Sequence, residues 1–398
     1  MRKLSNQTKF LLLIGMLYLA GTNIAMTFVN VYLVRLTNNI GFIIVQNILN
    51  YTALLFAFTC GTKLMSRINL KNILNLGIIS TSLYYLCILF LKKDSSSLLI
   101  PLGIFNGIGQ GFYYFSFNLL TGHLVLENEQ GKFFSFQQSF SYIFGVITPS
   151  ISGYIIAKFT QLTGYYILFS FAVLLFISGI VISKNISNFK LNKQIRLIDT
   201  LKVKNNIYWN TNKYYSFSNG IRESIFNQIF TVFAYSIINN EQIIGNYNSI
   251  MAFIGIFSSI FIASKFNRSN QKLFHLIESY VYLTICILLG IFKSPLFLLL
   301  FYLLFGLIYC WNSTLFQSMK FQLSTKAEGK FSQYEYIVAS EFPIACGRII
   351  GLSLALILCN ICNLSTAYSI LIIFDGSLWL IDHFVIDYKV KWLQKEKV

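Results

Sequence analysis

The chain has 398 residues, of which 11% are charged and 55% are hydrophobic, and its mean hydropathy is +0.62. A water-soluble domain carries about a quarter of its residues as Asp, Glu, Lys or Arg, so this composition excludes that class. The formal net charge of +17 comes from basic residues in short segments beside apolar runs. That placement indicates contact with anionic lipid and not with nucleic acid.

Apolar runs recur along the whole chain, each about 20 residues long and able to cross a hydrocarbon core of about 30 Å. Because lipid offers no partners to backbone polar groups, we expect these runs to be helices. We expect about twelve of them in an all-α membrane protein. Their centres fall near Met16, Ala53, Leu83, Gly107, Ile147, Leu174, Phe230, Gly255, Ile287, Leu304, Ala345 and Ile372.

The first run, residues 10–34, is too long for the apolar region of a signal peptide and lacks a small-residue cleavage site. We expect it to remain in the mature protein as the first helix. The longest stretch without an apolar run is 184–213, which is rich in Lys. We therefore expect two bundles of six helices, 1–183 and 214–398, joined by a basic linker over 184–213.

The two expected bundles repeat one another at an offset of about 198 to 199 residues, as the halves of many transporters do. The segment after the second run matches the segment after the eighth: Ser66, Arg67 and Asn69 correspond to Ser264, Lys265 and Asn267. Glycines also pair at this offset: Gly21 with Gly220, Gly107 with Gly306, and Gly153 with Gly351. The ordered recurrence indicates an internal duplication.

Most of the 31 Lys and Arg residues stand in alternate connections and near both ends of the chain. Basic residues concentrate on the cytoplasmic side of membrane proteins. We therefore expect the linker and both termini to be cytoplasmic in a multi-pass protein of the cell membrane. Arg67 and Lys265, at matched positions, are expected to help latch the cytoplasmic ends of the two halves.

The segment after the second run resembles the loop motif of the major facilitator superfamily, through Gly61, Ser66, Arg67, Asn69 and Lys71. Ser66 stands where that motif has Asp, Asn69 stands where it has Gly, and Gly61 is one place out of register. Asn tolerates the left-handed turn that Gly usually makes. The resemblance extends over the whole chain through the helix count and the repeat.

In the fifth run, Thr148, Pro149 and Gly153 belong to a segment similar to the superfamily's antiporter motif, with Thr and Ser replacing two glycines. Small residues let helices approach closely, which is the physical demand of that motif. The resemblance implies the major facilitator fold and export, although the departures leave the direction open. Residues 220–223 and 341–348 are similar to the YQGE-type branch of bacterial transporters.

Charged residues inside the expected helices belong mainly to the second half. A charge at the centre of a membrane helix costs about 2.5–3.5 kcal/mol on insertion scales, so it needs a partner or a wet cavity. Arg222, Glu223, Glu341 and Arg348 are candidates for charge coupling, either as a network that rearranges during transport or as fixed ion pairs. Glu341 and Arg348 lie two turns apart on one helix face and can each meet another helix.

Of these four residues, we expect Glu223 to carry the proton, because Arg222 stands beside it and water reaches helix 7. We expect Glu341 and Arg348 mainly to hold helix 11 against its neighbours. Three further acidic residues, Glu278, Glu335 and Asp375, lie nearer helix ends or at a depth that the sequence does not fix, and are interpreted as solvated or snorkelling carboxylates.

The resemblance also implies that helices 1, 4, 7 and 10 line a central cavity. Polar and aromatic residues of these helices are candidates for a largely apolar substrate site with a few hydrogen-bonding groups. These residues are Asn23, Asn106, Gln110, Tyr113, Tyr114, Trp311 and Asn312. Polar contacts between helices are an equally good interpretation of any one of them.

An enzyme would require clustered chemical groups, but His123, His275 and His383 are scattered in the sequence and no phosphate-binding loop is present. We expect a monomeric secondary transporter without cofactor or metal, whose partners are a small amphipathic substrate or a lipid, a proton and membrane lipid. Among the possible transport functions, we favour proton-coupled export of the substrate. Flipping of a lipid or glycolipid and uptake of a nutrient remain alternatives.

The predicted topology can be tested by labelling. Single cysteines introduced at Ser187 and Ser95 of a cysteine-free protein should react with a membrane-impermeant reagent from opposite sides of the membrane, because the two residues belong to connections that differ in basic content. The cysteine-free parent is the control. Labelling of both sites from one side would contradict the twelve-helix topology.

Overall fold

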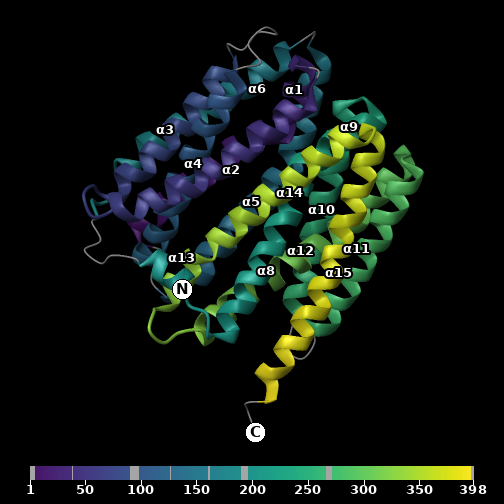
Figure 1. Cartoon of the computed structure of the whole chain (residues 1–398). Helices are drawn as coiled ribbons and strands as arrows, with labels where there is room; N and C mark the ends of the chain where they lie inside the picture. The colour runs from purple at the N-terminus through teal and green to yellow at the C-terminus, as the bar shows by residue number, and fades with distance from the viewer. Residues whose placement is uncertain are drawn as a thin grey trace. The chain divides into compact units, whose positions relative to one another are not determined.

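The computed structural model describes residues 5–37, 39–89, 98–125, 127–159, 162–189, 196–265 and 271–395. Within these ranges the backbone is almost entirely helical and contains no strand. The chain divides into two compact units, each a bundle of long helices (Figure 1). The first unit comprises Met1–Ile195 with Asn240–Ser249, and the second comprises Arg196–Asn239 with Ile250–Val398.

The first unit is built from six long helices followed by the start of a seventh. They are α1 (Asn6–Thr37), α2 (Ile40–Leu64), α3 (Leu70–Leu89), α4 (Leu99–Leu124), α5 (Glu127–Lys158), α6 (Thr163–Ser183) and the first turns of α10 (Glu241–Lys265). Helix α4 packs along both α2 and α3, and α1 packs along α6.

The second unit begins with a short helix, α7 (Leu197–Leu201), and continues with long helices. These are α8 (Ile207–Ser224), the π-helix η2 (Ile225–Phe230), α9 (Thr231–Ile238), the remainder of α10, α11 (Gln271–Phe292), α12 (Pro295–Lys326), α13 (Gln333–Ala339), α14 (Glu341–Ile361) and α15 (Leu364–Lys395). Three of these elements, α8, η2 and α9, form one continuous run over residues 207–238.

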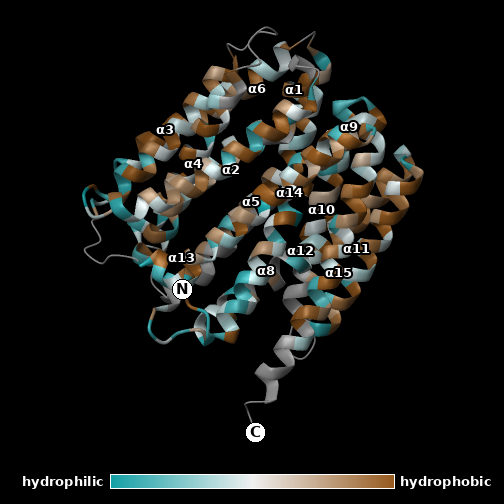
Figure 2. Cartoon of the chain, in the orientation of Figure 1, coloured by the Kyte–Doolittle hydropathy of each residue, from teal (hydrophilic) through white to brown (hydrophobic). Residues whose placement is uncertain are grey.

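The twelve predicted centres fall in twelve different helical runs of the described ranges, which confirms the all-α fold expected from the sequence. Seven helices there are long and apolar enough to cross a membrane by length and composition. Figure 2 shows apolar residues along much of the helices and hydrophilic residues near many helix ends. Helix α8 begins at Ile207, inside the expected linker 184–213, of which residues 190–195 lie outside the described ranges.

Helix ends follow local sequence signals. Asn206 and Ser294 cap α8 and α12 through their side chains, and Pro295 opens α12, where its missing N–H costs nothing. Asn239 ends α9 with φ 51, a left-handed conformation that Asn tolerates. Ser332 and Glu335 form a capping box that starts α13. These signals fix where the apolar runs stop.

Helix α8 differs from the other long helices because many of its polar residues are buried. The buried ones include Thr211, Asn212, Ser216, Ser218, Arg222 and Ser224. Their partners lie within the second unit: Asn212 donates to Ser324 Oγ at 3.1 Å, and Ser218 donates to Asp382 Oδ2 at 2.7 Å. A polar helix inside a bundle places hydrogen-bonding groups in the interior of the unit.

Glycines bring helices of each unit into backbone contact. A Cβ on Gly107 of α4 would lie 2.0 Å from the carbonyl oxygen of Asn50, and one on Gly306 of α12 would lie 2.6 Å from that of Met251. These two glycines are a pair of the sequence repeat, and both meet the helix two runs earlier. In the fifth run, the segment similar to the antiporter motif also packs closely, because a Cβ on Gly153 would lie 2.7 Å from the carbonyl oxygen of Glu241.

The contact of α8 with α14 is among the closest. A Cβ on Gly220 would lie 2.1 Å from the carbonyl oxygen of Ile344, and one on Gly347 would lie 2.1 Å from that of Phe217. Gly351 lies against Ile221 in the same way. The two helices therefore interlock through three glycines, which sets how the side chains between them face one another.

We expect Gly347→Ala to lower the melting temperature of the detergent-solubilised protein, because the new methyl group must displace the backbone of α8. Overpacking of this kind costs about 1–3 kcal/mol. Gly179→Ala in α6 is the matched control, since the nearest atom to its Cβ lies 3.9 Å away on a side chain. Equal melting temperatures for the two variants would contradict a tight α8–α14 contact.

Candidate functional site

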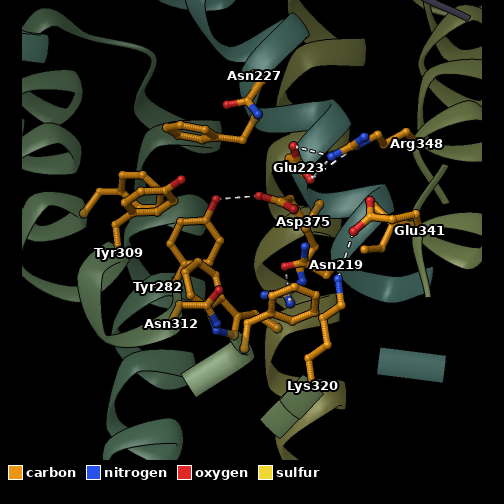
Figure 3. Close-up of a pocket in the computed structure, with 16 residues that line it drawn as sticks. Asn219, Glu223, Asn227, Tyr282, Tyr309, Asn312, Lys320, Glu341, Arg348 and Asp375 are labelled. Carbon is orange, nitrogen blue, oxygen red and sulfur yellow. Dashed lines mark hydrogen bonds and ion pairs between the residues drawn. The ribbon is translucent and has the colours of Figure 1, made fainter. Parts of the chain in front are cut away.

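A cavity of about 310 Å³ lies inside the second unit, between α8 with η2, α11, α12, α14 and α15 (Figure 3). It is lined by Asn219, Arg222, Glu223, Phe226, Asn227, Tyr282, Phe305, Tyr309, Asn312, Phe316, Lys320, Glu341, Ile344, Arg348, Asp375 and Trp379. Figure 3 shows two ion pairs on one side of this cavity and Tyr282, Tyr309 and Asn312 on the other. The lining is thus divided into a charged wall and an aromatic wall.

The charged wall contains two ion pairs. Arg348 Nη2 lies 2.8 Å from both carboxylate oxygens of Glu223, and Arg348 Nε donates to Glu223 Oε2 at 3.3 Å. Lys320 Nζ lies 2.9 Å from Glu341 Oε1. A guanidinium that grips a carboxylate with several donors forms a strong and well-oriented pair. The first pair joins α14 to α8 and the second joins α14 to α12, so breaking either pair would loosen the packing of α14.

The aromatic wall is formed chiefly by Phe226 of η2 with Phe305 and Tyr309 of α12. The ring centroids of Phe226 and Phe305 are 4.4 Å apart, and those of Phe305 and Tyr309 are 5.1 Å apart. Tyr282 of α11 adds its ring 5.3 Å from Phe305. Rings at these separations form a stable apolar surface that can receive a flat or apolar part of a ligand.

Beside the cavity lies a set of buried carboxyl groups, those of Glu278, Asp375 and Asp382, which we call the carboxyl layer. Asp382 accepts from Ser218 and pairs with Arg222, whose Nε lies 3.4 Å from Asp382 Oδ2. Glu278 Oε1 accepts from Trp379 Nε1 at 3.2 Å and from Asn312 Nδ2 at 3.3 Å. All three charged residues, Arg222, Asp382 and Glu278, are almost completely buried.

Asp375 lies at the cavity side of this layer. Its Oδ2 accepts a hydrogen bond from the hydroxyl of Tyr282, and the residue is 3% exposed. Three carboxyl groups, those of Glu278, Asp375 and Asp382, thus share the layer with the guanidinium of Arg222. If all three were ionised, the layer would carry a net charge of −2, which is costly away from water.

Within the described part of the chain, each of the three carboxyl groups also keeps one oxygen without a hydrogen-bond partner. These atoms are Glu278 Oε2, Asp375 Oδ1 and Asp382 Oδ1. An acceptor that is buried without a donor is unfavourable, whereas a protonated carboxyl group needs fewer donors. Binding of protons is therefore the simplest way for this layer to approach neutrality.

The structure brings together the four residues predicted for charge coupling, since Arg222, Glu223, Glu341 and Arg348 all line the cavity. Arg222 faces Asp382 and not Glu223, because neighbours in a helix point about 100° apart. Glu341 and Arg348 each meet another helix: Glu341 pairs with Lys320 of α12, and Arg348 pairs with Glu223 of α8.

The predicted substrate residues are divided between the units. Asn312 lines the cavity, whereas Trp311 donates to Ser258 Oγ at 2.7 Å and is not among the lining residues. In the first unit, Gln110 donates to Asn106 Oδ1 at 3.5 Å. Tyr113 is buried and stacks on Tyr18 with a centroid distance of 3.4 Å.

The two remaining substrate candidates, Asn23 and Tyr114, also belong to the first unit. Asn23 is half-buried in α1, and Tyr114 of α4 is 45% exposed. A substrate role for the residues of the first unit stays a prediction.

The loop-motif residues after α2 are mostly at the surface. Ser66 and Arg67 are exposed, the carbonyl oxygen of Asn69 accepts from the first turn of α3, and Lys71 Nζ donates to the carbonyl oxygen of Ile186 at 3.0 Å. Gly61 lies inside α2, where a Cβ would lie 2.6 Å from the ring of Phe115. Of the matched segment, Ser264 and Lys265 end α10, and Asn267 lies outside the described residues.

In α5, Thr148 and Pro149 are buried. The carbonyl oxygen of Pro149 would lie 2.3 Å from a Cβ on Gly245, so this segment meets the start of α10 in backbone contact. The side chain of Ser150 strengthens the contact through hydrogen bonds to Asn246 and Ser249.

One interpretation from the sequence is wrong for two of its three residues. Glu278 and Asp375 are buried within the second unit and are not solvated groups near helix ends, because α11 and α15 extend well beyond them. His275 and His383, which are far apart in the sequence, lie in contact, with their Nδ1 atoms 3.0 Å apart. Glu335 is 13% exposed and serves in the capping box of α13.

Sequence reasoning also missed Asp382. A signal was present, since Asp375 and Asp382 are seven residues apart and so lie on one face of a helix. The same spacing rule places His275, Glu278 and Tyr282 on one face of α11. Among the described residues, no group of three or more His, Cys, Asp or Glu side chains is arranged to hold a metal ion.

Comparisons with known proteins give one family model, two sequence relatives and several structures of the same fold. A sequence profile described as Major Facilitator Superfamily matches residues 9–331. The chain is 26% identical over 357 residues to the uncharacterized protein YqgE of Bacillus subtilis (strain 168), covering 86% of this chain and 80% of that protein. It is 29% identical over 159 residues to a protein encoded in the sodM 3' region of Geobacillus stearothermophilus, covering 40% of this chain and 74% of that one.

Solved transporter structures have the same fold. A point mutant of the nucleoside transporter NupG superposes with a TM-score of 0.72 at 12% identity, covering 96% of this chain and all of that one. A bacterial homologue of the iron transporter ferroportin in its inward-facing state also gives 0.72, at 15% identity, covering 98% and 99% of the two chains. At such low identity these likenesses show the fold alone.

The ion pair of Glu223 with Arg348 can be tested by a double-mutant cycle. We expect Glu223→Gln and Arg348→Gln each to lower the melting temperature, because each strands a charge beside the cavity. The double variant should recover much of the loss, with a coupling energy of about 0.5–3 kcal/mol. The pair Glu328→Gln and Arg348→Gln is the matched control, and additive effects are expected there because Glu328 is exposed and does not line the cavity.

Proposed function

Because the chain belongs to the major facilitator superfamily, we propose that it is a proton-coupled transporter that exports a small amphipathic molecule by alternating access. The family and the fold make the protein a multi-pass membrane transporter. Proton coupling, the class of substrate and the direction of transport are our proposals. The cell membrane as its location and cytoplasmic termini are proposed with them, from the distribution of Lys and Arg.

One observation carries the proton coupling: three buried carboxyl groups share one layer with the guanidinium of Arg222. The layer can be electrically neutral only when about two of the three carboxyl groups are protonated. Any rearrangement that moves Arg222, or admits water, changes how many protons the layer holds. A transporter whose two conformations bind different numbers of protons is coupled to the proton gradient.

Glu278 and Asp375 are the proposed carriers, because Asp382 is already held by Arg222 and Ser218. The sequence-based prediction that Glu223 carries the proton is compatible with its pairing with Arg348. That pair joins α8 to α14, so its opening would also free a carboxylate beside the cavity. Variants of Glu223, Glu278 and Asp375 can be compared in one transport assay, which shows which of these residues carries the proton.

The cavity supports a small amphipathic substrate. A charged wall with both signs faces an aromatic wall, so a molecule with a flat or apolar part and a polar end meets complementary groups on both sides. A two-chain lipid far exceeds a volume of about 310 Å³. The neighbours in fold include transporters of nucleosides and of oligopeptides, so the fold by itself does not choose the substrate.

Export is proposed from the segment similar to the antiporter motif. Pro149 and Gly153 lie in backbone contact with the start of α10, at Gly245 and Glu241. Close packing at this point is the physical demand of the motif, and the chain meets it with Thr and Ser in place of two glycines.

Transport can be measured with the purified protein in proteoliposomes carrying an imposed proton gradient. A panel of fluorescent amphipathic dyes supplies the small-molecule probes, and a fluorescent phosphatidylethanolamine supplies the lipid probe. We expect gradient-driven accumulation of at least one dye and no gradient-driven movement of the lipid. Comparing metabolites of deletion and wild-type cells then identifies the natural substrate. Lipid movement without dye transport would instead support the flippase alternative.

We expect Glu278→Gln and Asp375→Asn each to reduce accumulation against a gradient by about 10²-fold while exchange without a gradient persists, because loss of the carboxyl group removes the proton but not the cavity. Exposed Glu328→Gln is the matched control and should transport like the wild type. If Glu223→Gln alone stops accumulation, the proton is carried at the pair with Arg348. Wild-type accumulation by all three variants would contradict proton coupling through the second unit.

A further inference from the structure

A row of titratable side chains leads away from the cavity along the interface of α11 with α15. On α11 the row consists of Tyr282, Glu278 and His275, which share one face of the helix. His275 stands four residues from the start of α11, so the row runs from the cavity toward that end of the helix. His275, Glu278 and His383 do not line the cavity described above, although Tyr282 does.

The distances along this row are those of a chain of proton donors and acceptors. His383 Nδ1 lies 3.0 Å from His275 Nδ1. His275 Nε2 lies 3.9 Å from Glu278 Oε1, and that oxygen also accepts from Trp379. Glu278 is fully buried, whereas the two imidazoles keep 4% and 3% of their surface exposed, so a proton on Glu278 reaches water only through other groups.

The contact between the two histidines fixes where their protons lie. Two Nδ1 atoms at this distance require that one carries hydrogen and the other accepts it. When His383 donates, His275 carries its hydrogen on Nε2 and directs it at Glu278, which suits an ionised carboxylate. When His275 donates, its Nε2 presents a lone pair to Glu278, which suits a protonated carboxyl group.

His275 Nε2 has no hydrogen-bond partner within the described part of the chain, although it is buried and directed at Glu278. A purely structural histidine pair would not need a second nitrogen aimed at a carboxyl group. The two tautomers of the pair correspond instead to the two protonation states of Glu278.

We propose that His275 and His383 form a proton relay that connects Glu278 with the end of the second unit at which α11 begins. This proposal rests on the proposed function, in which Glu278 carries a proton. In the relay step the Glu278 proton moves to His275 Nε2 while the proton on His275 Nδ1 moves to His383 Nδ1. Glu278 becomes a carboxylate, His275 stays neutral, and His383, which already carries hydrogen on Nε2, becomes an imidazolium that releases that proton to water.

Other charged and titratable groups act on the relay from neighbouring helices. Arg222 of α8 interacts electrostatically with both Glu278 and His275, and Tyr215 of α8 interacts with Glu278. Asp375 and Asp382 of α15 interact with Arg222 in turn. From α12 the neutral amide of Asn312 donates to Glu278. The positive guanidinium of Arg222 attracts the Glu278 carboxylate that the relay step leaves behind.

Trp379 provides a reporter for the test, because its indole N–H bonds Glu278 Oε1 directly. In the full-length protein, Phe replaces the other tryptophans, Trp209, Trp311 and Trp392, so that emission comes from Trp379 alone. A stopped-flow jump from about pH 8 to about pH 5 then follows protonation of Glu278, with Glu278→Gln as the reference without signal. The carboxyl band in infrared difference spectra of the protein with its native tryptophans gives an independent measure.

We expect His275→Gln and His383→Gln each to slow the response by about 10²-fold, since the amide accepts the hydrogen bond but does not pass a proton on. Added imidazole should restore the rate in His275→Ala, which a merely structural role would not predict. His123→Gln, the third histidine of the chain, is the matched control and should respond at the wild-type rate.

Wild-type rates in both glutamine variants would overturn the relay while leaving proton carriage by Glu278 intact. Absence of any pH response from Trp379 and from the infrared band of the wild type would overturn proton carriage itself, and the relay with it. If the tryptophan-reduced protein does not fold, the infrared kinetics of the glutamine variants decide between these outcomes.

Discussion

Hydrocarbon supplies no hydrogen bonds, so every polar group within the membrane must find its partner in the protein or in a wet cavity. The second unit meets this constraint with a polar helix, α8, whose buried residues bond to α12 and α15. Arg222 is the centre of this arrangement, because it is the guanidinium around which the three buried carboxyl groups gather. The shape of the cavity and its capacity for protons both follow from this one buried cation.

The charged wall depends in turn on backbone packing. Gly220, Gly347 and Gly351 let α8 and α14 approach until backbone atoms touch, and at that separation Arg348 contacts Glu223 with several donors. Loss of the close approach would lengthen this pair and so change the charged wall of the cavity. The geometry of the ion pair between Glu223 and Arg348 therefore depends on the small residues that bring the two helices together.

The sequence predicted the helices well because hydropathy is a local property. Each apolar run was visible on its own, and capping residues such as Asn206 and Ser294 stand next to the ends they define. Partner choice was not predictable in this way. Arg222 and Glu223 are neighbours in the chain but meet different helices, and His275 meets His383 across 108 residues.

The burial of acidic residues within the helices was also hard to predict from the sequence. The interpretation of Asp375 as a solvated group was wrong although the centre of its run falls near Ile372, because hydropathy does not show which face of a helix is buried. The buried positions of Asp375 and Glu278 follow from the side chains of other helices that bond them, Tyr282 for Asp375 and Asn312 for Glu278. A periodicity of seven between Asp375 and Asp382 was the available signal, and it shows that a shared helix face is a better guide to buried acidic residues than their distance from an expected helix end.

The π-helix η2 has a consequence for the history of the chain. A π turn contains one residue more than an α turn, so it behaves as a single-residue insertion within α8, η2 and α9. A relative that lacks this residue would form a plain α-helix there, and the residues before Ile225 and after Phe230 would keep their faces, because the wider π turn takes up the extra residue. A one-residue gap at this place in an alignment would therefore mark transporters that keep the same cavity-facing positions on both sides of η2 but lack the π turn.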